Sequence, residues 1–180
     1  MIYVFLADGF EDIEALTPID YLRRCEYDVK TVGVGSQAIK SSHGVTVLTD
    51  IDDAQIDLND ELKMIVLPGG MPGTLNLEKN SNVIKAIDYC VDNNIYIGAI
   101  CAAPSILGHK KLLDGIKATC FPGFEQQLGN AKISSDLVCM EKNIITAKGA
   151  GAAHRFALKL IEALSSKERA EKLEGTLQCK

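Results

Sequence analysis

The chain has 180 residues, of which 47% are hydrophobic and 24% charged, and its formal net charge is −5. This length predicts a single domain, residues 1–180, that buries roughly 70% of its unfolded surface. The mild acidity argues against nucleic acid or an anionic membrane as a partner. The apolar start, Ile2–Leu6, has neither the basic flank nor the length of a signal peptide or membrane span, so we expect a cytoplasmic protein.

The chain begins with a predicted strand and an amphipathic helix. The strand is expected at Ile2–Leu6, where the apolar run is continuous. The helix is predicted from four apolar residues that we expect to face the sheet: Ile13, Leu16, Ile19 and Leu22. A strand followed by such a helix is the first half of a βαβ unit.

The predicted helix has an acidic start, Asp8 to Glu14. Glu11 and Asp12 are explained as partners of the helix dipole that face water. Glu14 stands beside apolar residues, and we expect the helix to carry it toward the edge of the sheet.

A second strand, Val29 to Val34, is followed by a segment of different character. Two short stretches, 37–40 and 45–48, are separated by turn residues and predict a hairpin at the sheet edge. The next stretch, Asp50 to Glu61, is acidic and aperiodic.

The third strand, Met64–Leu67, runs into the turn Pro68-Gly69-Gly70. Glycines let backbone N–H groups approach a ligand without a Cβ in the way, so Gly69 and Gly70 are predicted substrate-binding residues. The alternative is a tight turn that only packs. A helix is predicted next from the apolar residues Val83, Ile84, Ile87 and Val91.

The fourth strand, Ile95 to Ile100, leads directly into Cys101, two alanines and Pro104. Proline is well tolerated in a first helical turn, so Cys101 is predicted to lie where a buried strand turns into a helix. Ligands of open α/β sheets bind beyond the carboxyl ends of the strands, and the helix N-terminus stabilises negative charge there. We therefore expect a Cys101 pKa below its usual value and a thiolate at neutral pH.

The residues around Cys101 suggest how it could react. If the N–H groups of Gly70 and Ala102 converge near the sulfur, they form an oxyanion site for addition to a carbonyl. A carboxylate beside a thiolate would be repelled, so Glu14 would have a raised pKa, hold its proton and donate a hydrogen bond to the sulfur. It could then relay a proton.

The last elements complete the fold prediction. A strand is expected at Ile144–Ala147, a helix from Phe156, Leu160, Ile161 and Leu164, and a short helix at Lys167 to Leu173 before a polar tail. Continuously apolar strands that alternate with helices predict a mostly parallel sheet covered on both faces. The fold class is therefore α/β, a doubly wound three-layer αβα sandwich.

Six cysteines are scattered along the chain without CxxC pairs, and no Cys/His cluster has the spacing of a zinc site. We therefore predict no metal centre. In a reducing compartment most of these cysteines would be small hydrophobic residues.

Three segments together, Asp8 to Glu14, Leu67 to Gly70 and Gly98 to Pro104, resemble the ThiJ/PfpI family over essentially the whole chain. The turn with Cys101 is their most specific element, and Gly149-Ala150-Gly151 follows in the family's order. The resemblance implies a flavodoxin-like fold, usually a homodimer, with catalytic residues at Cys101 and Glu14. It also implies cofactor-free conversion of methylglyoxal or its protein adducts to lactate, as by a glyoxalase or deglycase.

The sequence departs from the family pattern at one position near the cysteine. Many members carry a histidine after the segment Ala118 to Cys120, where this chain has Phe121. The three histidines, His43, His109 and His154, lie elsewhere in the chain and are interpreted as surface or structural residues. Since histidine is the commonest general base near neutral pH, its loss bears on turnover. His43 alone could reach a partner's site, because it lies in the hairpin.

A second function is compatible with the same residues. Cys101 could be a redox sensor or part of a stress chaperone, oxidised to a sulfinic acid that hydrogen bonds from Glu14 stabilise. Cys120 could resolve a sulfenate as a disulfide, although a buried structural thiol is the simpler interpretation.

Overall fold

The computed structural model describes residues 1–178, and its centre is a sheet of seven strands. In spatial order these are β10 (Val138–Glu141), β11 (Ile144–Ala147), β7 (Tyr96–Ile100), β6 (Met64–Leu67), β1 (Ile2–Leu6), β2 (Val29–Gly33) and β5 (Ile51–Asp52). Neighbours pair in parallel except β10, which is antiparallel to β11. The predicted mostly parallel sheet is confirmed.

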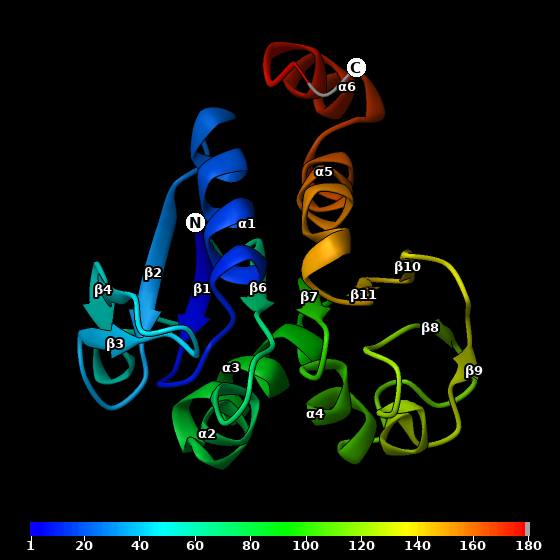
Figure 1. Ribbon diagram of the computed structural model, residues 1–180, viewed down its shortest axis with the longest axis horizontal. Coiled ribbons are helices and arrows are strands. Elements are labelled where there is room, and N and C mark those ends of the chain that lie inside the picture. Colours follow the sequence, from blue (N-terminus) through cyan, green and yellow to red (C-terminus); the bar gives the residue numbers. More distant parts are fainter. Residues whose placement is uncertain (179–180) are drawn as a thin grey trace.

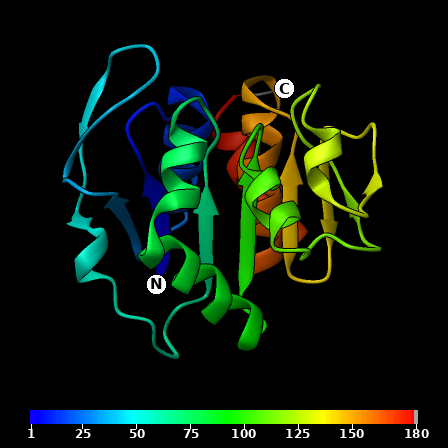
Figure 2. The same cartoon turned by 90° about the horizontal axis from the view of Figure 1, so that it is seen from below.

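Helices cover both faces of this sheet (Figure 1). One face carries α1 (Asp12–Arg24) and α5 (Ala153–Leu164), with α6 (Lys167–Thr176) against α5. The other face carries α2 (Gly73–Lys79), α3 (Ser81–Asp92) and α4 (Pro104–His109), which stand in front of the strands in Figure 2. The flavodoxin-like αβα sandwich is confirmed. The predicted polar tail is helical to Thr176, and Cys179 and Lys180 lie outside the described residues.

Alternation along the buried strands divides the core into two layers. In β1, Tyr3 and Phe5 pack with α3 and α4, whereas Val4 and Leu6 pack with α1 and α5. All of them are buried, because a parallel sheet between two helical layers has no face in water.

The predicted apolar face of the first helix is wrong at two positions. Ile13 and Leu16 are 53% and 39% exposed. The buried face of α1 runs through Glu14, Ala15, Pro18, Ile19 and Leu22. The predicted helical spacing is correct, but Ala15 and Pro18 also belong to the buried face. With these two residues included, the buried face of α1 is centred so that it also contains Glu14.

The predicted apolar face of α3 is also wrong at one position. Val91 is 38% exposed, and the buried positions of α3 are Val83, Ala86, Ile87 and Cys90. Small residues let this helix approach the sheet closely, which apolar size alone does not predict.

The hairpin is confirmed as β3 (Ala38–Lys40) and β4 (Thr46–Leu48). Residues 50–61, which are acidic and aperiodic, contain β5 and a short 3₁₀ helix, Asp53–Gln55. Asp53 is buried and accepts hydrogen bonds from the Gly35 N–H and from the side chains of Asn80 and Asn82. Asp53 thus joins this segment to parts of the chain that are distant in sequence. Local hydrophobic periodicity does not reveal such contacts.

Residues 117–133 form a small lobe beside the sheet. A short parallel pair, β8 (Lys117–Ala118) and β9 (Lys132–Ile133), encloses a 3₁₀ helix at Glu125–Leu128. A further 3₁₀ turn, Ala150–Ala152, precedes α5. The lobe brings the segment after Ala118 toward the end of β7.

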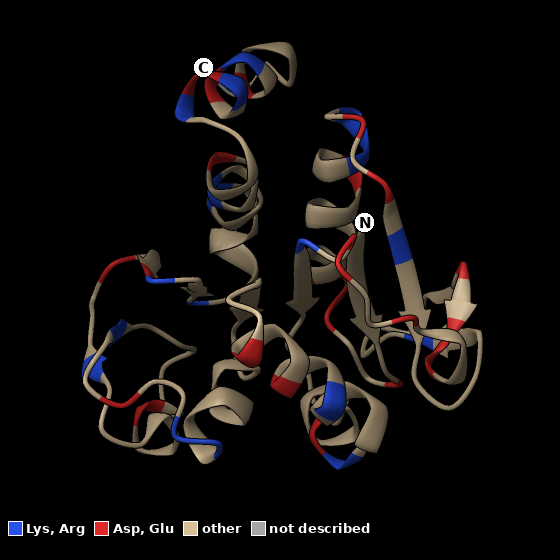
Figure 3. Ribbon diagram, turned by 180° about the vertical axis from the view of Figure 1, so that it is seen from behind, with Lys and Arg blue, Asp and Glu red and all other residues tan. Residues whose placement is uncertain are grey.

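Basic and acidic residues are interspersed on the ribbon, and α6 carries both kinds (Figure 3). Within residues 1–178, no helix has the length and apolar character needed to cross a membrane.

Gly98 in β7 sets the distance between the sheet and α5. A Cβ at this position would lie 2.8 Å from Leu160 Cδ2 and 3.0 Å from Phe156 Cζ. We predict that Gly98→Val lowers the free energy of unfolding by about 1–3 kcal/mol through overpacking, measured by urea denaturation. Gly175→Ala in α6 is the control, because a Cβ there meets nothing within 4 Å. Equal losses in both variants would contradict the packing argument.

Candidate active site at the carboxyl edge of the sheet

The candidate site lies where four adjacent parallel strands end. In the order β11, β7, β6 and β1, these strands are followed by Ala150, Cys101, Gly69 with Gly70, and Glu14. The carboxyl ends of parallel strands share one edge, so these residues meet there although they are distant in sequence. The sequence segments singled out above are thus neighbours in space.

Cys101 stands on a sharp turn between β7 and α4. Its φ of 65° lies in the left-handed region, which costs a residue with a Cβ on the order of 1 kcal/mol or more. Two hydrogen bonds hold this conformation: the Cys101 N–H donates to Ala147 O, and the Phe121 N–H donates to Cys101 O, both at 2.9 Å. The side chain is half-buried, whereas Cys25, Cys90, Cys120 and Cys139 are buried.

The sulfur lies beside the two N–H groups expected from the sequence. Backbone hydrogen bonds from Gly70 and Ala102 reach Cys101, and both lower the pKa of its thiol. Helix α4 has only six residues, so these two amides, rather than a long helix dipole, are the local source of positive potential.

Glu14 is the acid that faces Cys101, and its side chain is only 1% exposed. Glu11 caps α1 by accepting a hydrogen bond from the Glu14 N–H at 2.8 Å, which fixes the first helical turn. The Glu14 carboxyl accepts the Gly69 N–H at 3.0 Å and is also hydrogen-bonded to the Ala150 N–H and the Cys101 side chain. The sequence had no signal for Ala150 beyond its place in a family motif.

Burial dominates the ionisation of this pair. It raises the pKa of Glu14 to about 7, with the negative charge of Glu11 adding to the effect. Burial and the negative charge of Glu14 raise the pKa of the Cys101 thiol to about 12. The expected lowering of the Cys101 pKa is therefore wrong for the free site, because desolvation outweighs the two amides. Glu14 gives up its proton before the thiol does.

Gly69 was predicted to bind substrate, but in the structure its N–H donates to Glu14. A Cβ there would lie 2.5 Å from Cys101 Cβ and 2.6 Å from Glu14 Oε2, so only glycine lets these two side chains approach. Because the Gly69 N–H already donates to Glu14, it is not available to a substrate oxygen. Gly70 and Ala102 are the amides that remain next to the sulfur.

Phe121 is a neighbour of the site that the sequence identified only as a departure from the family. Besides its backbone bond to Cys101, its ring contacts Gly149, where a Cβ would lie 3.1 Å from Phe121 Cδ2 and 3.6 Å from Glu14 Oε1. An apolar ring thus stands beside the pair.

The three histidines have partners away from the Glu14 carboxyl. His43 contacts Asp12 at 2.8 Å, which raises the pKa of His43, and His109 contacts Glu78 at 2.6 Å. His154 contacts Tyr21 Oη at 2.7 Å. The hairpin is held against α1 by the His43 contact.

One group of side chains could hold a cation by proximity. Ligand atoms of Glu11, Asp12 and His43 lie within 4.8 Å of one another. His43 is 31 residues from Asp12 in the chain, so spacing rules did not find the group. The Asp12 and His43 side chains are already paired with each other.

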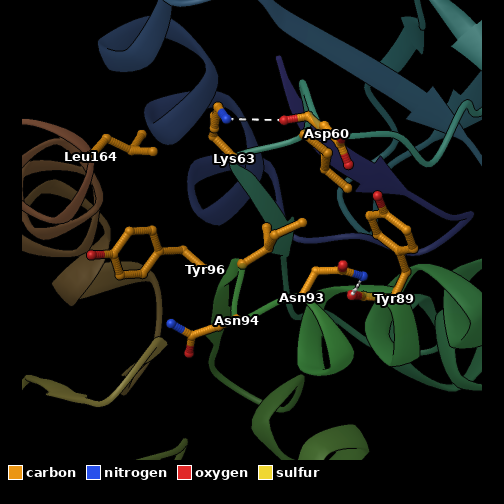
Figure 4. Close-up of a pocket in the computed structure, with 9 residues that line it drawn as sticks. Asp60, Lys63, Tyr89, Asn93, Asn94, Tyr96 and Leu164 are labelled. Atoms are coloured by element: carbon orange, nitrogen blue, oxygen red, sulfur yellow. Dashed lines mark hydrogen bonds between the residues drawn. The ribbon is translucent and has the colours of Figure 1, made fainter.

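A separate cavity of about 380 Å³ lies at the opposite end of β6 and β7 (Figure 4). It is lined by polar and aromatic side chains, including Lys63, Tyr89 and Tyr96. Lys63 and Tyr96 stand at the start of β6 and β7, whereas Cys101 follows the end of β7. This cavity is not part of the cysteine site.

The fold and the site define a class: flavodoxin-like α/β proteins with a cysteine on the turn after a central strand and a buried glutamate beside it. Residues 1–163 match the model of the DJ-1/PfpI family, and the chain belongs to that family. The family resemblance inferred from the sequence is confirmed.

Individual relatives agree with this assignment. The chain is 34% identical to Protein dj-1beta of Drosophila melanogaster, covering 94% of this chain and 92% of that one. It is 31% identical to the glutathione-independent glyoxalase DJR-1.2 of Caenorhabditis elegans, covering 91% and 87%. The solved structure of oxidised Toxoplasma gondii DJ-1 superposes with a TM-score of 0.93 at 33% identity, covering 98% and 96%.

The raised pKa of Glu14 makes stability depend on pH. An unfolded glutamate ionises near 4.5, but the folded chain holds this proton to about pH 7. Between these values the folded state binds more protons, so stability present at lower pH is lost as pH rises through the folded pKa. We compare the free energy of unfolding of wild type with that of Glu14→Gln. We predict that the difference, wild type minus variant, falls by on the order of 3 kcal/mol from about pH 4 to about pH 8.

Urea denaturation at several pH values measures this difference. Glu168→Gln, at an exposed position in the first turn of α6, controls for the loss of one carboxylate. A difference between wild type and Glu14→Gln that stays constant with pH would contradict the assignment.

Proposed function

We propose that this protein converts reactive aldehydes such as methylglyoxal, or their adducts on proteins, to hydroxy acids such as lactate, without a cofactor. Cys101 is the nucleophile and Glu14 the proton carrier. The observation that carries the proposal is the contact between the two side chains, with the Gly70 and Ala102 amides beside the sulfur. The glyoxalase name of the Caenorhabditis elegans relative supports the same class of reaction.

In the first step the sulfur of Cys101 attacks the aldehyde carbon. As the S–C bond forms, the thiol proton passes to the Glu14 carboxylate, and the carbonyl electron pair moves to oxygen. The amides of Gly70 and Ala102 stabilise that oxygen, which then takes the proton to give a hemithioacetal. A thiol with a raised pKa can react in this way because its base is already hydrogen-bonded to it.

In the second step Glu14 removes the proton from the former aldehyde carbon and returns one to the neighbouring carbon. The hemithioacetal hydroxyl proton passes to the ketone oxygen, so the ketone is reduced to an alcohol while the hemithioacetal carbon becomes a thioester, and no external oxidant is needed. Water then hydrolyses the thioester, releasing the hydroxy acid and the free thiol. A carboxyl with a pKa of about 7 suits both removal and return of a proton at neutral pH.

We also propose that two copies of this chain associate. Four exposed apolar side chains support this: Ile13 and Leu16 on α1, and Val45 and Leu48 in or beside β4. The contact between His43 and Asp12 joins the hairpin to α1, so these side chains belong to adjoining elements. The remaining partners that we propose are the aldehyde or the glycated protein.

Replacing the nucleophile tests the activity. We predict that Cys101→Ser abolishes lactate formation from methylglyoxal, because a serine hydroxyl ionises far less readily than a thiol. Glu14→Gln is expected to lower kcat by about 10²–10⁴-fold, since it cannot accept the proton. Enzymatic determination of D-lactate measures both.

Cys139→Ala is the matched control, because Cys139 is buried in β10 and outside the pair. It is expected to keep wild-type turnover. Equal activity in wild type and Cys101→Ser would exclude Cys101 as the nucleophile.

A redox function is the second candidate. The same amides and the Glu14 carboxyl offer hydrogen bonds to the oxygens of a sulfinate on Cys101, and among the cysteines of residues 1–178 Cys101 is half-buried whereas the other four are buried. Cys120 is only 3% exposed, and burial raises its pKa to about 11, which disfavours it as a resolving thiol.

Peroxide titration tests this candidate. We predict that limited peroxide adds two oxygen atoms to Cys101 before any other cysteine, measured by intact mass and peptide mapping. Glu14→Gln should shift the product toward the irreversible sulfonic state, because one hydrogen bond to the sulfinate is weakened. Oxidation spread evenly among the cysteines would contradict the redox hypothesis.

A further inference from the structure

Phe121 combines an exposed ring with a fixed backbone. The residue is 48% exposed, which is unusual for a side chain of this size. Its N–H donates to Cys101 O at 2.9 Å, and its carbonyl accepts the Phe124 N–H at 3.1 Å. The backbone is thus held from both sides while much of the ring stays in contact with water.

The ring lies close to residues of the cysteine site. Its edge contacts Gly149, and Glu14 Oε1 approaches the same glycine. The Phe121 backbone bonds to the residue that carries the sulfur. A molecule bonded to Cys101 would therefore have the ring, the Glu14 carboxyl and Gly149 near it.

An aromatic ring at this position offers apolar area and a flat face but no proton. It cannot serve as an acid or base, so its effect on a substrate is limited to contact with the part that does not react. Aromatic pairs attract each other beyond the effect of the area they bury, which a methyl group cannot match. The ring thus favours aldehydes with a planar apolar substituent.

We propose that Phe121 determines specificity, giving the site a preference for aryl over methyl aldehydes. The inference rests on the proposed aldehyde chemistry for the nature of the substrate. The ring itself takes no part in the proton transfers. Because it touches the unreactive part of the substrate equally in the ground and transition states, the preference is expressed mainly in KM.

Steady-state kinetics with phenylglyoxal and methylglyoxal test the proposal. We predict that Phe121→Ala lowers kcat/KM for phenylglyoxal about 5–10-fold, through KM, and changes kcat/KM for methylglyoxal less than about twofold. Phe121→Trp is expected to keep the aryl preference. Ile133→Ala removes an apolar side chain of similar exposure, 49%, and is expected to leave both values unchanged.

A second measurement is independent of turnover. Phenacyl bromide and bromoacetone alkylate the Cys101 sulfur with loss of bromide, and their rate ratio is compared with that for free cysteine. We predict a ratio several-fold higher in wild type than in Phe121→Ala.

The two measurements separate the two hypotheses. Absence of turnover with an altered alkylation ratio would refute the proposed function and retain the specificity role of Phe121. Turnover of both glyoxals with unchanged ratios in Phe121→Ala would overturn the inference and leave the proposed function standing. An alkylation ratio that Phe121→Ala leaves unchanged also overturns the inference when neither glyoxal is turned over.

Discussion

The hydrogen bond from the Gly69 N–H to Glu14 Oε2 is the contact on which the site depends. It holds a carboxyl in an almost fully buried position against Cys101, where a Cβ on residue 69 would collide with both side chains. The glycine thus supplies a donor and leaves room at the same point. Together with the Ala150 N–H and the Cys101 side chain, this donor compensates the buried carboxyl for its lost hydration.

The parallel sheet makes this contact possible. Strands β11, β7, β6 and β1 are adjacent and end at one edge of the sheet. The segment that follows each strand therefore lies next to the Glu14–Cys101 pair or contains one of its residues. The strained conformation of Cys101 is held by bonds to Ala147 on one side and Phe121 on the other. Rigid strands therefore fix the position of the sulfur more firmly than a long loop would.

Much of this arrangement could be predicted from the sequence, and the failures have physical causes. The strands were found because continuous apolar runs are specific for buried parallel sheets. Glu14 was expected near the cysteine, but beside Ile13 and Leu16, which are exposed; Ala15 and Pro18 form the buried face instead. The pKa of Cys101 was expected to fall because proximity to amides is visible in a motif. The larger effect, desolvation, depends on tertiary packing.

Phe121 stands where the family resemblance implies a histidine in many members, and this bears on how the proposed site would work. An aromatic ring cannot share the proton of the thiol. Glu14, with its pKa raised to about 7 by burial, then becomes the group next to the sulfur that titrates near neutrality. In the proposed mechanism, the same burial that keeps the thiol protonated raises the pKa of its hydrogen-bonded base, Glu14, to near the operating pH. In the proposed mechanism, base strength and substrate contact, which a histidine could combine, are divided between Glu14 and Phe121.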